Sequence, residues 1–136
     1  MTFKTITFQN TDGETLSGRL DLPLGPVPDA YAIFAHCFTC SKHTKAVTAV
    51  SHALTRKGIA VLRFDFTGLG DSEGDFSDTT FSSNVADLIT AARYLETHFA
   101  APKILIGHSF GGTACLKAAG QLRSVKAVAT IGAPFD

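Results

Sequence analysis

One ten-residue stretch, Lys103 to Gly112, limits the folds open to this chain more than any other. An apolar run from Ile104 leads into Gly107-His108-Ser109-Phe110-Gly111, and small, helix-compatible residues follow. A serine with glycine two positions away on each side is typical of a sharp strand-to-helix turn, because strand and helix can approach closely only where side chains are absent. Such a turn exposes the hydroxyl at the edge of a sheet, beside the first amides of the helix. Ser109 is therefore the candidate nucleophile; the alternative is an ordinary crossover in which it only caps the helix.

Strand and helix patterns alternate along the rest of the chain. Residues 3–9 and 15–22 alternate apolar and polar side chains around Asn10-Thr11-Asp12-Gly13, which predicts an antiparallel hairpin. Short apolar runs at 31–35, 59–66 and 104–107 predict buried strands, and residues 125–131 predict a last strand. Helical spacing predicts one helix ending near Lys57, one over 84–99 capped by Ser82 or Ser83, and one from Ser109 to near Gly120.

This order of elements predicts an α/β fold with a doubly wound, mainly parallel sheet. The N-terminal antiparallel hairpin occupies residues 1–22, strand–helix units occupy 31–131, and residues 1–136 form one domain. Three unusual loops follow the predicted strands, after Ala35, Phe66 and Gly107. Because ligands bind at the carboxyl ends of parallel strands, we expect these loops to meet at one site.

Composition excludes several classes of function. The formal net charge is zero, with 12 basic and 12 acidic residues, which leaves no basic field for nucleic acid and no polybasic membrane anchor. The apolar runs are too short to span a bilayer, and Met1-Thr2-Phe3-Lys4 lacks an apolar signal core, so the expected location is cytoplasmic. Three cysteines, an odd number, indicate reduced thiols rather than a disulfide scaffold.

Together the three loops resemble those of the α/β-hydrolase family, and the resemblance covers the whole chain. More narrowly, the chain is similar to the hydrolase half of bacterial proteins that fuse this domain to an OsmC-type peroxidase domain. The matching segments are 36–42, 63–72, 81–84, 107–112 and 131–134. The resemblance implies a serine hydrolase of carboxylic esters or related acyl compounds that works through an acyl-enzyme and needs no cofactor. A fused or separate OsmC-type domain is the implied partner.

The resemblance also assigns roles to individual residues. The backbone N–H groups of Phe38 and Phe110 would form the oxyanion hole, in a loop where the family often has His-Gly-Phe and this chain has His36-Cys37-Phe38. Asp65 and the glycines at 68 and 70 are expected to support the turn beneath the site. His36 is expected to order its loop rather than act as a base.

The catalytic acid and base of such an enzyme are not evident in this sequence. In this fold they follow the serine in the order acid, then histidine. After Ser109 the chain has no histidine, and its only acid is Asp136, a weak candidate for the catalytic acid. The expectation is therefore a chain with an incomplete triad, whose missing groups come from a lost C-terminal portion or a second chain. The strand at 125–131 would then be an apolar edge open to self-association.

Two alternatives come from other classes. Cys37-Phe38-Thr39-Cys40 places two cysteines between a strand and a helix, as in thiol-redox modules. A metal site is not expected, because no second cysteine pair is present and His36 and His43 lie too close in sequence to complete a closed shell. The other alternative is a non-catalytic fragment that serves only in assembly.

Overall fold

A computed structural model describes residues 1–38 and 40–133 of the chain. It contains six strands and three α-helices among these residues, with one short 3-10 helix, η1 (Phe76–Asp78). The strands are β1 (Thr2–Gln9), β2 (Thr15–Leu22), β3 (Ala30–Ala35), β4 (Ile59–Phe64), β5 (Ile104–His108) and β6 (Ala127–Ile131). The α-helices are α1 (Lys45–Thr55), α2 (Phe81–His98) and α3 (Phe110–Ala119).

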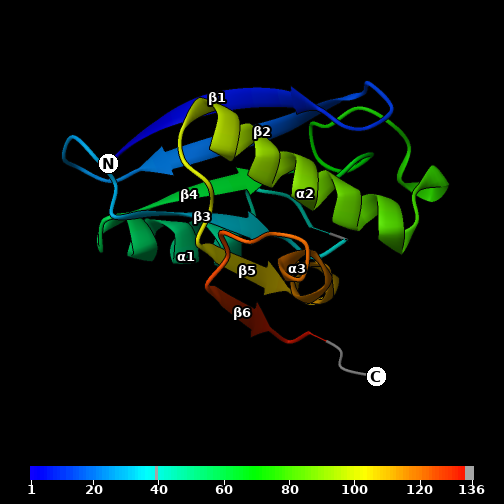
Figure 1. Cartoon of the computed structure of the whole chain (residues 1–136). Coiled ribbons are helices and arrows are strands. Elements are labelled where there is room, and N and C mark those ends of the chain that lie inside the picture. Colours follow the sequence, from blue (N-terminus) through cyan, green and yellow to red (C-terminus); the bar gives the residue numbers. More distant parts are fainter. Residues whose placement is uncertain (39, 134–136) are drawn as a thin grey trace.

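All six strands form one mixed sheet in the order β1-β2-β4-β3-β5-β6 (Figure 1). The hairpin of β1 and β2 is antiparallel, and β2 also runs antiparallel to β4. The neighbours β4, β3, β5 and β6 are parallel to one another. This is the doubly wound sheet with an N-terminal hairpin that the sequence predicts. The register pairs Ala35 with Gly107, so the loops after β3 and β5 start side by side.

Helices cover both faces of the sheet, as the alternation of elements requires. On one face, Val47 of α1 packs with Val61, Phe34 and Ile106 from the central strands. On the other face, α2 and α3 bury a larger cluster, to which Leu88 and Leu95 of α2 belong. Both helices are visible on that side of the sheet in Figure 1. Strands β3, β4 and β5 are thus buried from both sides, which explains their continuous apolar sequences. The outer parallel strand, β6, is mostly exposed.

Helix α2 begins earlier than the sequence predicts. Its cap is Thr80, not Ser82 or Ser83: the Thr80 hydroxyl accepts from the Ser83 N–H, and the Ser83 hydroxyl accepts from the Thr80 N–H. This reciprocal capping box satisfies two amides that the first turn leaves open. Strand β4 also ends earlier than predicted, at Phe64. The Asp65 N–H still donates to the Ser17 carbonyl of β2, and the Asp65 side chain enters a polar network.

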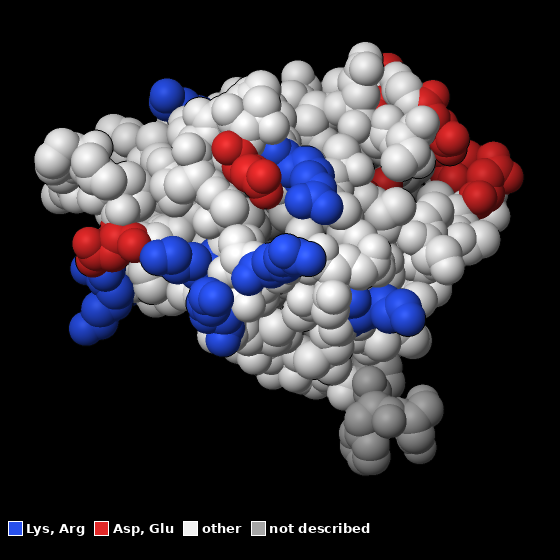
Figure 2. Space-filling model, in the orientation of Figure 1, with Lys and Arg blue, Asp and Glu red and all other residues white. Residues whose placement is uncertain are grey.

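Charge is separated over the surface although the formal net charge is zero. Figure 2 shows acidic side chains gathered where the β1–β2 turn meets the segment before α2. Asp12, Glu14, Asp75, Asp78 and Asp87 line a cavity there. Among the described residues, no helix combines the length and apolarity that a membrane span requires.

Candidate active site at the carboxyl edge of the sheet

Ser109 occupies the sharp turn between β5 and α3. Its φ of 58° and ψ of −125° make it the only non-glycine residue with a positive φ in the described part of the chain. Such a conformation costs about 1–3 kcal/mol and persists only where the surroundings hold it. Here the Ser109 N–H donates to the Ile131 carbonyl at 2.8 Å, and the Ser109 carbonyl accepts from the Gly112 N–H at 2.9 Å. The side chain is half-buried and lines an open cleft.

The glycines around Ser109 are required by close backbone contact. A Cβ on Gly107 would overlap the backbone of Gly112, one turn into α3. A Cβ on Gly111 would overlap the carbonyl oxygens of Ala35 and His36, at the end of β3. The glycine pattern therefore lets β5, α3 and the loop after β3 come together at the serine.

Phe38 and Phe110, the two expected oxyanion residues, lie together beside this turn. Their rings stack with centroids 5.7 Å apart and planes 14° apart. Phe38 also packs edge-on against the buried Phe66, with centroids 5.3 Å apart. These contacts tie the loop after β3 to the start of α3. The loop after β3 and the start of α3 border a cleft of about 530 Å³. The cleft is lined by Cys37, Phe38, Phe76, His108, Ser109, Phe110 and Gly132.

His36 orders the loop that carries Phe38. Its ring is fully buried, and Nδ1 donates to the Cys37 carbonyl at 2.5 Å, the only role a carbonyl partner permits. Burial lowers the pKa of His36, so the ring is neutral at neutral pH. Nε2 lies 3.7 Å from Asp65 Oδ1. An imidazole held in this way, away from the cleft, is not placed to take a proton from Ser109.

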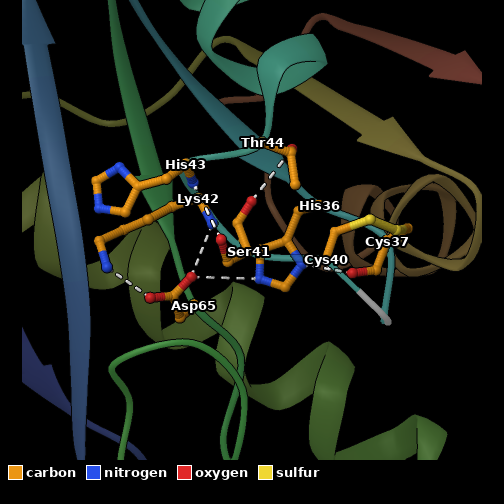
Figure 3. The surroundings of a disulfide bond; sticks show 8 residues. All are labelled: His36, Cys37, Cys40, Ser41, Lys42, His43, Thr44 and Asp65. Atoms are coloured by element: carbon orange, nitrogen blue, oxygen red, sulfur yellow. Dashed lines mark hydrogen bonds and ion pairs between the residues drawn. A yellow bond between two sulfur atoms is a disulfide. The ribbon is translucent and has the colours of Figure 1, made fainter.

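Cys37 and Cys40 form a disulfide, which corrects the expectation of reduced thiols (Figure 3). The loop after β3 makes a tight turn in which the Cys40 N–H donates to the Cys37 carbonyl at 3.0 Å. The two Cα atoms are consequently 5.2 Å apart, within the range that a disulfide spans. The third cysteine, Cys115, is buried in α3, and burial raises the pKa of its thiol to about 12.

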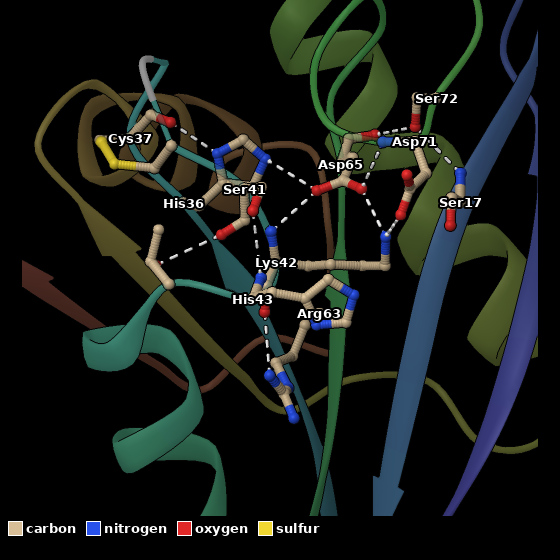
Figure 4. A network of polar contacts seen from close by, with 12 residues as sticks. Ser17, His36, Cys37, Ser41, Lys42, His43, Arg63, Asp65, Asp71 and Ser72 are labelled. Carbon is tan, nitrogen blue, oxygen red and sulfur yellow. Dashed lines mark hydrogen bonds and ion pairs between the residues drawn. A yellow bond between two sulfur atoms is a disulfide. The ribbon is translucent and has the colours of Figure 1, made fainter.

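A buried polar network centred on Asp65 supports the site (Figure 4). One carboxylate oxygen accepts from the Lys42 backbone N–H at 2.8 Å, and the other accepts from Lys42 Nζ at 2.5 Å and from the Asp71 N–H at 3.0 Å. A Cβ on Gly70 would overlap this carboxylate. Asp65 therefore joins the loop that carries Phe38 to the glycine-rich loop after β4.

A second buried ion pair extends this network into the sheet. Arg63 Nε donates to Asp21 at 2.8 Å, and Arg63 also donates to the Lys42 carbonyl at 2.9 Å. Burial opposes ionisation of Asp21, but hydrogen bonds from Ser51, Arg19 and Arg63 outweigh it and hold the pKa of Asp21 below its usual range. Sequence reasoning gave Lys42, Arg63 and Asp21 no role. The available signal was Arg63, a charged residue within the run 59–66 that was predicted to be buried.

The other candidate residues do not join Ser109. His43, His52 and His98 fall on segments where the sequence favours solvated side chains, and His43 and His98 are exposed. His52 is instead half-buried, with Nε2 sealed from solvent. Asp136, the weak candidate for the acid, lies outside the described residues. One set of possible metal ligands occurs in the described part of the chain: the ligand atoms of Cys37, Cys40 and His108 lie within 4.8 Å of one another.

A central parallel sheet with helices on both faces, and a strained serine turn at its carboxyl edge, define the α/β-hydrolase class. The Hydrolase_4 family model, described as serine aminopeptidase S33, matches residues 27–136. The chain belongs to this family of α/β hydrolases. The match favours a hydrolase over the thiol-redox module and the non-catalytic fragment.

Similar proteins of known structure have the same fold. An esterase domain of a Rhodothermus marinus protein is 57% identical, with a TM-score of 0.84, and the match covers all of this chain and 52% of that one. An α/β serine hydrolase without a lid from Xanthomonas campestris is 30% identical, with a TM-score of 0.85, and the match covers all of this chain and 65% of that one.

Curated relatives include palmitoyl-protein thioesterase ABHD10, a mitochondrial protein. The rat protein is 30% identical over 100 residues, which is 74% of this chain and 32% of that protein. The human protein is 36% identical over 89 residues, which is 65% of this chain and 28% of that protein. The chain thus matches about half of the Rhodothermus chain and about a third of these relatives.

Proposed function

We propose that this chain is the nucleophile-bearing part of a serine hydrolase that cleaves carboxylic esters or thioesters. The observation that carries the proposal is the positive φ of Ser109 at the junction of β5 and α3, beside a cleft. Relatives named as an esterase domain and as a palmitoyl-protein thioesterase support the acyl substrate class. A cytoplasmic location and an adjoining OsmC-type domain belong to the proposal, although the curated relatives are named as mitochondrial.

In the proposed reaction, Ser109 Oγ attacks the acyl carbon while a base takes its proton. The carbonyl oxygen gains negative charge, and the N–H groups of Phe38 and Phe110 stabilise it as an oxyanion hole. Collapse of the tetrahedral intermediate breaks the bond to the leaving alcohol or thiol, which receives the proton. Water then attacks the acyl-serine and releases the acid, restoring the hydroxyl.

The base and its acid are proposed to come from outside this chain. No histidine follows Ser109 in the sequence, and the Nδ1 of the buried His36 is already bonded to its own loop. A serine without a base retains only the contribution of binding and the oxyanion hole, about 10³–10⁴-fold over water in known serine hydrolases. Slow hydrolysis of a p-nitrophenyl ester is therefore expected. Rapid turnover by the unsubstituted chain that is lost in Ser109→Ala would contradict the proposal that the base comes from outside this chain.

Covalent labelling tests the nucleophile directly. A fluorophosphonate is expected to modify the chain on Ser109 slowly, over a long incubation with excess reagent, because no base within the chain activates the hydroxyl. The label is detected as an added mass on the peptide containing residues 104–117. Ser109→Ala is expected to abolish the label, whereas Ser82→Ala, which removes an exposed serine on α2, is expected to leave it unchanged. Equal labelling of Ser109→Ala and the unsubstituted chain would refute the proposal.

We also propose that β6 pairs with another strand. Among the described residues β6 has one neighbour, β5, and it ends at Ile131, whose side chain is 43% exposed. Unpaired edges of this kind recruit strands from other chains. Sedimentation is expected to show association that increases with concentration and decreases in Ile131→Lys. A strictly monomeric profile at high concentration would contradict it.

A further inference from the structure

The loop that carries Phe38 also brings together three side chains that bind soft metal ions. Cys37 and Cys40 come from the turn after β3, and His108 is the last residue of the neighbouring strand β5. Their ligand atoms lie within 4.8 Å of one another. Two sulfurs and one imidazole nitrogen are the donor set of an open, three-ligand zinc site.

We propose that reduction of the Cys37–Cys40 disulfide creates a Zn²⁺ site formed by these two thiolates and the imidazole of His108. A dithiol supplies two electrons and two protons, the S–S bond breaks, and the dithiol leaves as its own disulfide. Zn²⁺ then displaces the two thiol protons and accepts a lone pair from the imidazole of His108. This inference goes beyond the proposed hydrolase and does not depend on it.

The surroundings make the site accessible to an ion. Cys40 and His108 are half-buried, and Cys37 and His108 line the open cleft. In a tetrahedral zinc centre, ligands about 2.0–2.3 Å from the ion lie somewhat less than 4 Å from one another. Opening the disulfide lets the sulfurs separate toward this spacing. Ser109 lines the same cleft as Cys37 and His108, so the proposed site lies next to the candidate nucleophile.

The third cysteine does not compete for the ion. Cys115 is buried, and the pKa of its thiol is raised to about 12, so it stays protonated at neutral pH. His43 is exposed and follows Cys40 by three positions, and it provides a matched control for His108.

Metal titration of the reduced and oxidised chain tests the inference. The reduced chain is expected to bind one equivalent of Zn²⁺, and Co²⁺ in its place is expected to give thiolate charge-transfer bands with tetrahedral ligand-field bands. The oxidised chain is expected to bind neither ion. Loss of one ligand in Cys40→Ser or His108→Gln is expected to weaken Zn²⁺ binding about 100-fold, whereas His43→Gln is expected to leave it unchanged.

Three results would overturn the inference: no binding to the reduced chain, one ion shared by two chains, or equal affinity in His108→Gln and the unsubstituted chain. The titration requires no hydrolysis. Absence of Zn²⁺ binding contradicts the metal site whether or not Ser109 is labelled. Zn²⁺ binding by a chain whose Ser109 is not labelled even after a long incubation with excess fluorophosphonate contradicts only the proposed hydrolase.

Discussion

Replacing Asp65 by alanine is expected to lower the free energy of unfolding by about 3–5 kcal/mol, the usual consequence of removing one partner from a buried ion pair. Asp65 is fully buried, and the ammonium of Lys42, with 4% of its side chain exposed, is held between it and Asp71. Without Asp65, the backbone N–H groups of Lys42 and Asp71 lose their acceptor, and the Lys42 ammonium keeps only the exposed carboxylate of Asp71. Domains of this size are stable by only about 5–15 kcal/mol, so the loss is a large fraction of the total.

Denaturant unfolding of matched variants measures this effect. Asp71→Asn is the control, because Asp71 also pairs with Lys42 but has 72% of its side chain exposed, where water screens the interaction. We expect the free energy of unfolding to change little in Asp71→Asn and to fall strongly in Asp65→Ala. Equal midpoints for Asp65→Ala and the unsubstituted chain would show that the network does not support the fold.

Gly111→Ala is expected to cost about 3 kcal/mol or more and to abolish labelling of Ser109. The added Cβ would overlap the carbonyl oxygens of Ala35 and His36, which are backbone atoms and cannot rotate away. Relief requires α3 to move from β3, and this movement separates Ser109 from the loop that carries Phe38. Overpacking of this kind destabilises even where side chains can adjust.

The same substitution at Gly120 is the matched control. Gly120 ends α3 with a φ of −65°, and a Cβ there would meet only the Lys117 carbonyl oxygen, at 3.6 Å. Gly120→Ala is expected to raise stability by about 0.4–1 kcal/mol, because the unfolded chain loses freedom. Thermal unfolding and fluorophosphonate labelling of both variants distinguish a steric overlap at residue 111 from a general intolerance of alanine at glycine positions of this helix. Normal labelling in Gly111→Ala would contradict the proposed contact of α3 with β3.

The sequence predicted the sheet and the serine turn because both depend on local patterns. Alternation around Asn10 and Gly13 predicts the hairpin, and the glycines at 107 and 111 predict a close crossing of strand and helix. The start of α2 was wrong because Thr79, Thr80, Ser82 and Ser83 are all good caps. In the structure, Thr80 is the cap, and it exchanges hydrogen bonds with Ser83.

The support beneath the site could not be predicted in the same way. Lys42 pairs with Asp65, and Arg63 pairs with Asp21, across separations that no local pattern encodes. The disulfide was missed because an odd number of cysteines in the chain argues against a disulfide scaffold. Cys37 and Cys40 pair because the turn after β3 brings their sulfurs together, and the number of cysteines does not reveal this turn. His108 follows Cys40 by 68 residues, half the length of the chain, and only the pairing of β3 with β5 makes them neighbours.

The pairing of β3 with β5 has a kinetic consequence. β3 meets β5 only after the intervening segment, with α1, β4 and α2, has been brought into place. Bringing the ends of a long segment together costs conformational entropy before any contact between them forms. Contacts between residues far apart in the sequence therefore slow folding. The serine turn and its companion loop should therefore acquire native structure late, after the β1–β2 hairpin has formed, and amide exchange during refolding would register protection in that order.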